Sequence, residues 1–293
     1  MASPVADEVQ LAEPDPGPTP GPAEPPRARH RLRTALIVVA ALLAVIVVAG
    51  VVWFVFGLFP AEQLSDDQAL VDFRASSGDT AAAEGRPVAG VYPGTATGTE
   101  SIGLPGFDEQ LGPNAPMTLT YGDAGCFTSR IDFNSHHWRS WTYCPSATAT
   151  FALGGLESWT ERKAPGLDLA TLSTYTCETP LDVVWTGAAV GDTRTGSCPG
   201  TSDLDDAVTD DAATLEVLGT ETLEIDGTSV DVVHVRTVDE FTNAQTGAER
   251  GEWWFDAETA LPVKFRLDAS LSGASGDYAE DIDFELTSLQ PAT

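Results

Sequence analysis

The sequence predicts an all-β protein, in which a curved antiparallel sheet, a half-barrel-like meander, follows a single N-terminal transmembrane helix. Two observations carry this prediction. An uncharged apolar run extends from Ala35 to Phe59, and about 20 such residues suffice for a helix to cross the hydrocarbon core of a membrane. After Val88 the chain is rich in Thr, Val, Trp and Phe, with turn residues about every 8–12 positions, which is typical of antiparallel β domains.

Residues 1–33 are rich in proline and poor in large apolar side chains, so we expect a disordered tail. The apolar run predicts a transmembrane helix over residues 34–59, and therefore an integral membrane protein with one span. A cleaved signal peptide is the alternative. Its apolar region would be only about 7–15 residues long, with small residues at the cleavage site, whereas Phe59 and Pro60 occupy that place here.

The orientation of the span follows from its flanks. Acidic residues follow the run, and four arginines precede it: Arg27, Arg29, Arg31 and Arg33. Because cytoplasmic flanks carry the excess of basic residues, we expect a cytoplasmic N-terminus, a cell-membrane location and an extracellular or periplasmic C-terminal domain.

The charge balance excludes one class of partner. The chain carries 44 acidic and 15 basic side chains, a net charge of −29 at pH 7, and its only lysines are Lys163 and Lys264. Nucleic-acid binding requires clustered Lys and Arg, so we expect no nucleic-acid partner. The low lysine content, with abundant Ala, Gly, Asp and Thr, is also typical of a GC-rich genome, as in membrane-anchored envelope proteins of actinobacterial type.

All four cysteines follow the apolar run, which predicts disulfides in an oxidising compartment. Of the three connectivities that four cysteines permit, we favour Cys126 with Cys144 and Cys177 with Cys198. Each such bridge closes a loop of about 20 residues and contributes roughly 3 kcal/mol in the chain-entropy model. A zinc site from Cys126, His136, His137 and Cys144 is the alternative, but the spacing matches no zinc pattern. We expect no metal and no cofactor.

The exported part divides into a stalk and a β domain. Residues 60–87 are small and polar, and predict a flexible stalk with one short helix near Leu64–Arg74. Residues 88–293 predict the β domain. Strands in its first half are expected at these ranges: Met117–Tyr121, Cys126–Asn134, His136–Tyr143, Thr148–Leu153 and Leu156–Glu161.

An acidic segment, Asp203–Asp211, separates the two halves, and we interpret it as a solvated linker. A calcium loop is the alternative, but Val208 stands where an EF-hand loop requires glycine. After this segment, Leu223–Ile225 and Ser229–Val238 flank Asp226-Gly227, a dipeptide that favours a type I′ hairpin turn. Further strands at 252–255, 261–271 and 282–286 complete an expected five-strand meander.

Alternation along the last two strands predicts a buried face, because residues two apart point to the same side of a sheet. This face is the candidate ligand-facing surface if the sheet encloses a cavity. Its six members are Val263, Phe265, Leu267, Ile282, Phe284 and Leu286.

Catalytic motifs are not apparent in the sequence. The G-x-S-x-G motif is missing, and we expect His234, inside a strand, to be a satisfied or solvent-facing histidine. The aromatic segment HHWRSWTYC, residues 136–144, has two interpretations that the sequence leaves open: core packing behind a disulfide, or a surface on which a ligand stacks. We therefore predict a binding domain rather than an enzyme.

The hairpin EWWFDAETALPVKFRLD, residues 252–268, resembles a strand pair of the periplasmic lipoprotein-carrier-like LolA, LppX and RseB group. The matching positions are Trp254, Asp256, Thr259, Leu261 and Pro262, whereas Ala260 replaces the usual turn glycine. The resemblance implies a half-barrel that binds acyl chains or a partner peptide. The expected function is thus an anchored domain that binds a lipidic ligand or an envelope protein. A sensor of envelope state acting through a partner membrane protein is the alternative, and an exported hydrolase ranks below both.

Overall fold

The computed structural model describes residues 27–56, 61–76, 85–103, 108–164, 167–274 and 276–293. The chain forms two units, residues 1–54 and 55–293. The first unit contains α1 (Arg27–Phe56) except for its last two residues. Most of the expected proline-rich tail, residues 1–26, lies outside the described residues, and its last seven positions are helical rather than disordered.

Helix α1 is apolar along most of its length. The stretch Arg33–Val51 has a mean hydropathy of 3.0 and is exposed throughout. An exposed apolar helix of this length, 30 residues in all, fits a single-pass membrane anchor or a signal anchor. The described helix ends at Phe56, so the last residues of the expected span lie outside the described part of the chain.

The second unit is one antiparallel sheet, as the sequence predicts. Its first strands are β1 (Gly90–Tyr92), β2 (Gly94–Ser101), β3 (Glu109–Leu111), β4 (Met117–Tyr121), β5 (Phe127–Asn134), β6 (His137–Cys144), β7 (Phe151–Ala164) and β8 (Leu167–Val184). The remaining strands are β9 (Thr193–Ser197), β10 (Gly200–Ser202), β11 (Asp205–Ile225), β12 (Thr228–Asn243), β13 (Gln245–Asp256), β14 (Pro262–Gly273) and β15 (Gly276–Leu286). A short 3₁₀ turn, Asp123–Gly125, precedes β5.

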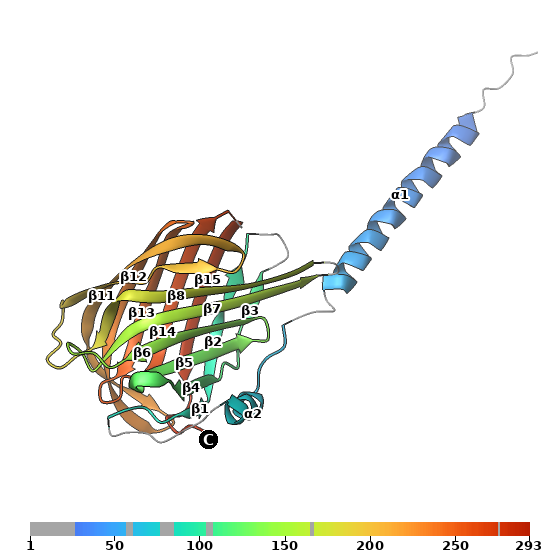
Figure 1. Ribbon diagram of the computed structural model, residues 1–293. Coiled ribbons are helices and arrows are strands. Elements are labelled where there is room, and N and C mark those ends of the chain that lie inside the picture. Colours follow the sequence, from blue (N-terminus) through green and yellow to red (C-terminus); the bar gives the residue numbers. More distant parts are fainter. Residues whose placement is uncertain (1–26, 57–60, 77–84, 104–107, 165–166, 275) are drawn as a thin grey trace, which may run out of the picture. The chain divides into compact units, whose positions relative to one another are not determined.

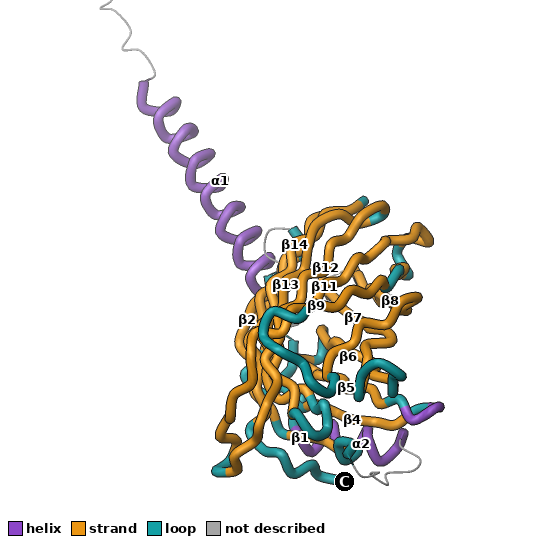
Figure 2. Tube along the Cα trace, turned by 90° about the vertical axis from the view of Figure 1, so that its left-hand side faces the viewer, coloured by secondary structure: helices purple, strands orange, loops and turns teal. Residues whose placement is uncertain are grey.

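The sheet curls until its two ends meet. Its strand order is β1-β4-β5-β6-β7-β8-β10-β11-β12-β13-β14-β15-β2-β3, with β9 beside β8 and β11. Strands β1 and β2 lie near opposite ends of this order, yet only Pro93 separates them in the chain. The sheet therefore folds over into two facing walls, β4–β8 and β11–β15, which Figure 1 shows as two layers and Figure 2 shows from the side.

The expected meander is confirmed in β11 to β15, which pair consecutively. Its first turn has the predicted type I′ character, because both Asp226 (φ 50°) and Gly227 (φ 71°) have positive φ. Burial alternates along β15 in the predicted phase, with Ile282, Phe284 and Leu286 inside.

Two sequence-based boundaries are wrong. The strand expected at Thr148–Leu153 begins only at Phe151, and it is continuous with the strand expected at Leu156–Glu161. Both belong to β7, because Gly154-Gly155 forms an irregularity in the ladder instead of a turn. A Cβ atom on Gly155 would lie 2.8 Å from the Tyr175 carbonyl oxygen, so glycine permits this close approach. The segment Asp203–Asp211 is not a linker, since β11 begins at Asp205 and pairs with β12 from Thr209 onward.

The described part of the expected stalk packs on the β domain. The predicted short helix is present as α2 (Asp66–Ser76), and it buries Ala69 and Phe73. Before it, the Ser135 N–H donates to the Glu62 carbonyl oxygen at 2.7 Å. Residues 61–76 are therefore part of the folded unit rather than a free stalk.

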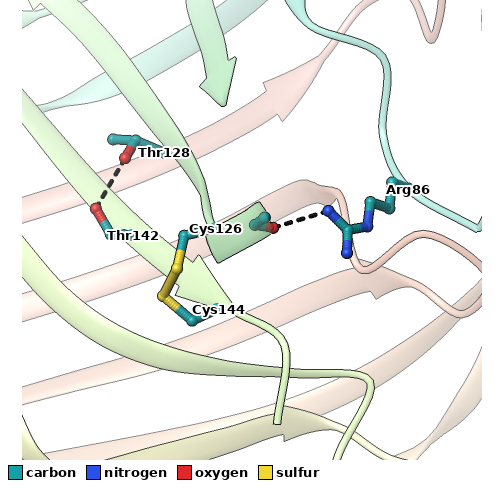
Figure 3. Close-up of a disulfide and its surroundings, with 6 residues drawn as sticks. Arg86, Cys126, Thr128, Thr142 and Cys144 are labelled. Atoms are coloured by element: carbon teal, nitrogen blue, oxygen red, sulfur yellow. Dashed lines mark hydrogen bonds between the residues drawn. A yellow bond between two sulfur atoms is a disulfide. The ribbon is translucent and has the colours of Figure 1, made fainter. Parts of the chain in front are cut away.

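Both predicted disulfides are present, Cys126–Cys144 and Cys177–Cys198. Figure 3 shows the first bridge, which joins Cys126, directly before β5, to Cys144, the last residue of β6. Beside it lies the hydrogen bond of 2.8 Å between the Thr128 and Thr142 hydroxyls. Nearby, Arg86 Nη1 donates to the Gly125 carbonyl oxygen at 3.0 Å. The bridge thus fixes the end of one wall.

Candidate functional site: a cavity between the two walls

A cavity of about 300 Å³ lies between the two walls of the sheet. Strands β6, β7 and β8 line it on one side, and β12 and β13 on the other. Its surface combines aromatic and aliphatic side chains with hydroxyl and charged groups. It is therefore built as small-molecule sites commonly are, from apolar walls with a few placed polar groups.

One end of the cavity is apolar and aromatic. Trp141 of β6 meets Trp253 of β13 edge to face, with ring centroids 5.2 Å apart, and Tyr143 meets Phe255 in the same way at 5.9 Å. Three aliphatic side chains close this end: Leu153, Leu181 and Val183. The Trp253 Nε1–H donates to the Thr237 hydroxyl at 3.2 Å, so the indole is fixed and its polar atom is satisfied.

Gly251 explains the orientation of the Trp253 indole in the cavity wall. A Cβ atom at this position would collide with Trp253 Nε1 and would lie 2.7 Å from Thr237 Oγ1. The missing side chain lets the Trp253 indole turn toward β12 and interrupts the inward-facing row of β13 between Glu249 and Trp253.

The opposite side of the cavity borders a charged seam. The register aligns Asp239 of β12 with Glu249 of β13, then Ala269 of β14 with Glu280 of β15 and Glu100 of β2. These carboxylates form one row on the inner face of the β11–β15 wall. A row of like charges needs cations from elsewhere if it is to stay buried.

The facing wall supplies these cations from β6 and β7. Arg139 Nη2 lies 2.6 Å from Glu249 Oε2, and its Nη1 lies 3.0 Å from Glu280 Oε2. Arg162 Nη2 lies 2.5 Å from Glu100 Oε2. We call Arg139, Arg162 and His137, together with the carboxylate row of Asp239, Glu249, Glu280 and Glu100, the charged seam.

His137 completes the seam between two carboxylates. Its Nε2 lies 2.7 Å from Glu280 Oε1 and its Nδ1 lies 3.5 Å from Glu100 Oε2. Burial opposes protonation of His137, but Glu100 and Glu280 outweigh it and raise its pKa. Burial likewise opposes ionisation of Glu280, but Arg139 and His137 prevail and lower its pKa.

The seam has a surplus of carboxyl groups at the Asp239 end. Both carboxyl oxygens of Asp211, on β11, have no hydrogen-bond partner among the described residues, although the residue is only 2% exposed. Burial, with a contribution from Glu249, raises the pKa of Asp211 to about 7. Burial also raises the pKa of Asp239, and Glu249 and Asp211 raise it further. We call Asp211, Asp239 and Glu249 the acidic corner.

The far rim of the cavity consists of strand ends and turns. It includes Leu204 in the β10–β11 turn, which is 53% exposed, and Asp277 beside the β14–β15 turn. Ile102 at the end of β2 and Leu169 near the start of β8 lie on the same rim. These positions are nearest to solvent, so the rim is the natural entrance.

The six side chains predicted to face a ligand lie in the closed part of the core. All are buried, and they share one face as expected, with Phe265 opposite Phe284 and Leu267 opposite Ile282. None of the six lines the cavity, whose surface comes from neighbouring strands. Phe265 packs directly behind this surface, with its ring centroid 4.6 Å from that of Trp253. A ligand-facing role for the six stays a prediction.

The structure also places the candidate metal ligands and the histidines considered from the sequence. Within the described ranges, no group of three or more His, Cys, Asp or Glu side chains is arranged to hold a metal ion. His136 Nδ1 lies 3.0 Å from Glu109 Oε1. His234 stacks on Trp254 with ring centroids 4.2 Å apart. Its Nε2 lies 3.4 Å from Glu252 Oε2 but has no hydrogen-bond partner among the described residues, so the expectation of a satisfied histidine is not met at this atom.

The segment 136–144 contributes to both the core and the cavity wall, and stacking of a ligand on it stays a prediction. Alternate residues Arg139, Trp141 and Tyr143 face the cavity, and Trp141 and Tyr143 are also packed into the aromatic core. Trp138 points the other way and stacks on Trp159.

The carboxylates of the seam and the acidic corner were not singled out from the sequence. The available signal was strand parity: Glu280 precedes Ile282 by two residues and therefore shares its inner face.

No protein-family model matches this chain, and neither a curated protein nor a solved structure matches it.

Proposed function

We propose that this protein is a single-pass membrane protein whose extracytoplasmic β domain binds a hydrophobic or lipidic ligand. The single observation that carries the proposal is the cavity between the two walls. Its volume of about 300 Å³ is at the lower end of the range of ligand sites, about 300–1,000 Å³. It suits one apolar chain or a small amphiphile.

The composition of the walls supports an apolar ligand. Trp141, Tyr143, Trp253 and Phe255 present ring surface at one end, and the aliphatic side chains there are almost fully buried. Burial of apolar ligand surface contributes roughly 25 cal/mol per Å². The charged seam closes the other side, so a ligand would lie along the aromatic end with its polar part near the seam.

The remaining parts of the proposal concern the cellular location of the β domain and its resemblance to the LolA group. The arginines before the apolar helix support a cytoplasmic N-terminus, and the two disulfides support an oxidising compartment for the β domain. The hairpin that resembles the LolA group supports a carrier-like role. There Ala260 adopts a φ of 61°, the conformation that the usual glycine would favour.

The experiment is ligand extraction from the full chain purified in nanodiscs, followed by titration with decanol while the fluorescence of the cavity tryptophans is recorded. We expect a saturable change in emission, because Trp141 and Trp253 form the wall. Titration without any saturable change, together with no extracted lipid beyond that of empty nanodiscs, would contradict the proposal. Stoichiometric co-purification of an envelope protein with an empty cavity would favour the partner alternative.

A further inference from the structure

We propose that the ligand of this cavity carries a primary ammonium group on its apolar body, and that the acidic corner receives this group. The inference rests on the proposed function and specifies the class of ligand. It depends on two independent observations. One is a cavity with an aromatic end, and the other is a buried aspartate, Asp211, that has no hydrogen-bond partner among the described residues and is paired with Phe241, which lines that cavity.

The geometry of the strands brings the three carboxyl groups together. Asp239 and Glu249 are directly paired on β12 and β13, and both line the cavity. Directly paired residues have Cβ atoms about 4.5–5.5 Å apart. Asp211 pairs with Phe241, two residues beyond Asp239, so Asp211 and Asp239 are diagonal neighbours on one face, at about 7–8 Å.

The cations of the charged seam bind Glu249, Glu280 and Glu100. Arg139 divides its two terminal nitrogens between Glu249 and Glu280, and Arg162 and His137 reach Glu100 or Glu280. None of these ion pairs includes Asp211 or Asp239. Buried carboxyl groups without a partner are costly, and this end of the seam has three carboxyl groups but only one arginine, Arg139.

A primary ammonium supplies what the corner lacks. It is compact and has three donors, the number of carboxyl groups in the corner. The ligand's apolar body would then extend from Asp239 toward Trp141 and Trp253, which line the same cavity. A carboxylate or phosphate head group would instead meet uncompensated acids, so anionic amphiphiles are excluded from this orientation.

The test compares probes of equal chain length on the full chain in nanodiscs. Decylamine should bind at least about tenfold more tightly than decanol, because hydrogen bonds to charged groups contribute about twice as much as neutral ones, and decanoate should bind most weakly. Octanoyl lysophosphatidylethanolamine, which has a single chain, provides the lipid-headgroup arm. Its binding would assign the ammonium to a lipid, and its failure beside decylamine binding would assign it to a free amine.

Isosteric variants test whether the acidic corner binds the ammonium group. Asp239→Asn and Asp211→Asn should each remove most of the preference for decylamine and leave decanol binding unchanged, which also shows that the cavity is intact. Asp268→Asn, on the outer face of β14, is the matched control and should keep the preference. Equal binding of decylamine and decanol by the wild type would overturn the inference and leave the proposed function standing. Binding of none of the probes would overturn both.

Discussion

Arg139 Nη2 of β6 lies 2.6 Å from Glu249 Oε2 of β13, so an arginine of one wall is bound to a carboxylate of the wall that faces it. Both residues are buried, and the second terminal nitrogen of Arg139 binds Glu280. This contact joins strands that are 110 residues apart in the chain. It therefore connects the two walls beside the cavity.

We predict that Arg139→Met destabilises the domain by about 3–5 kcal/mol, because removal of one partner leaves buried charges uncompensated. Chemical denaturation followed by far-UV circular dichroism measures the change. Arg266→Met is the control, since the Arg266–Asp283 pair is 61% and 57% exposed and such surface pairs contribute about 0–1 kcal/mol. Similar losses in both variants would contradict a structural role for the charged seam.

The sequence could predict the fold to the extent that local patterns determine it. The turn at Asp226-Gly227 and the alternation in β15 depend on neighbouring residues alone, and both are correct. The acidic composition of Asp203–Asp211 predicted a linker wrongly, because composition does not show which side of a strand an aspartate faces. Asp211 is inside only because β11 pairs with β12 in that register.

We predict that Asp211 lowers the free energy of unfolding to an extent that depends on pH. Its pKa in the folded protein is raised to about 7, so between about pH 4 and pH 7 the unfolded chain releases this proton while the folded state retains it. The free energy of unfolding therefore falls as pH rises through this window. The gain from Asp211→Asn should be larger at pH 8 than at pH 4 by about 2–4 kcal/mol, because one pKa unit corresponds to about 1.4 kcal/mol.

Denaturation of the wild type and Asp211→Asn at both pH values measures this difference. Asp239, Glu249, Arg139 and Tyr175 are the charged and titratable groups that interact with Asp211 or its neighbours, and they are common to both proteins. The comparison therefore reports Asp211 together with its effect on the pKa of Asp239. A stability gain that is the same at pH 4 and pH 8 would show that the aspartate is not buried unpaired.

We predict that the core and the cavity wall respond differently to truncation. Phe284→Ala should cost about 3–5 kcal/mol, because Phe284 is fully packed and its loss leaves a void. Leu156→Ala should cost less, since Leu156 is only partly buried and borders existing space. Thermal unfolding of the full chain would distinguish the two, and equal costs would mean that the space beside Leu156 is filled.

The position of the cavity could not be predicted from the sequence for a related reason. Alternation placed Phe265 and Phe284 on the inner face correctly. It could not show that the Trp253 indole packs over Gly251 and binds Thr237, because this depends on contacts between side chains of β12 and β13. Strand parity determines which face is inside, whereas packing across strands determines where that face stays open.

We predict that the N-terminus is cytoplasmic and the β domain is exported. A reporter active only outside the cytoplasm should be active when fused after Thr293, because four arginines precede the apolar helix. Changing Arg27, Arg29, Arg31 and Arg33 together to Ser should reduce this activity. Activity of a cytoplasm-only reporter at the same position in the unchanged protein would contradict the orientation.

The most direct test of the proposed binding cavity is to fill it with a large side chain placed on β7. Ser158 lines the cavity, and its neighbour Glu157 lies on the other face of β7. In the full chain in nanodiscs, Ser158→Phe should abolish the saturable fluorescence response to decanol and decylamine, whereas Glu157→Phe should bind both as the wild type does. Unchanged binding by folded Ser158→Phe would contradict the claim that the ligand occupies the space between the two walls.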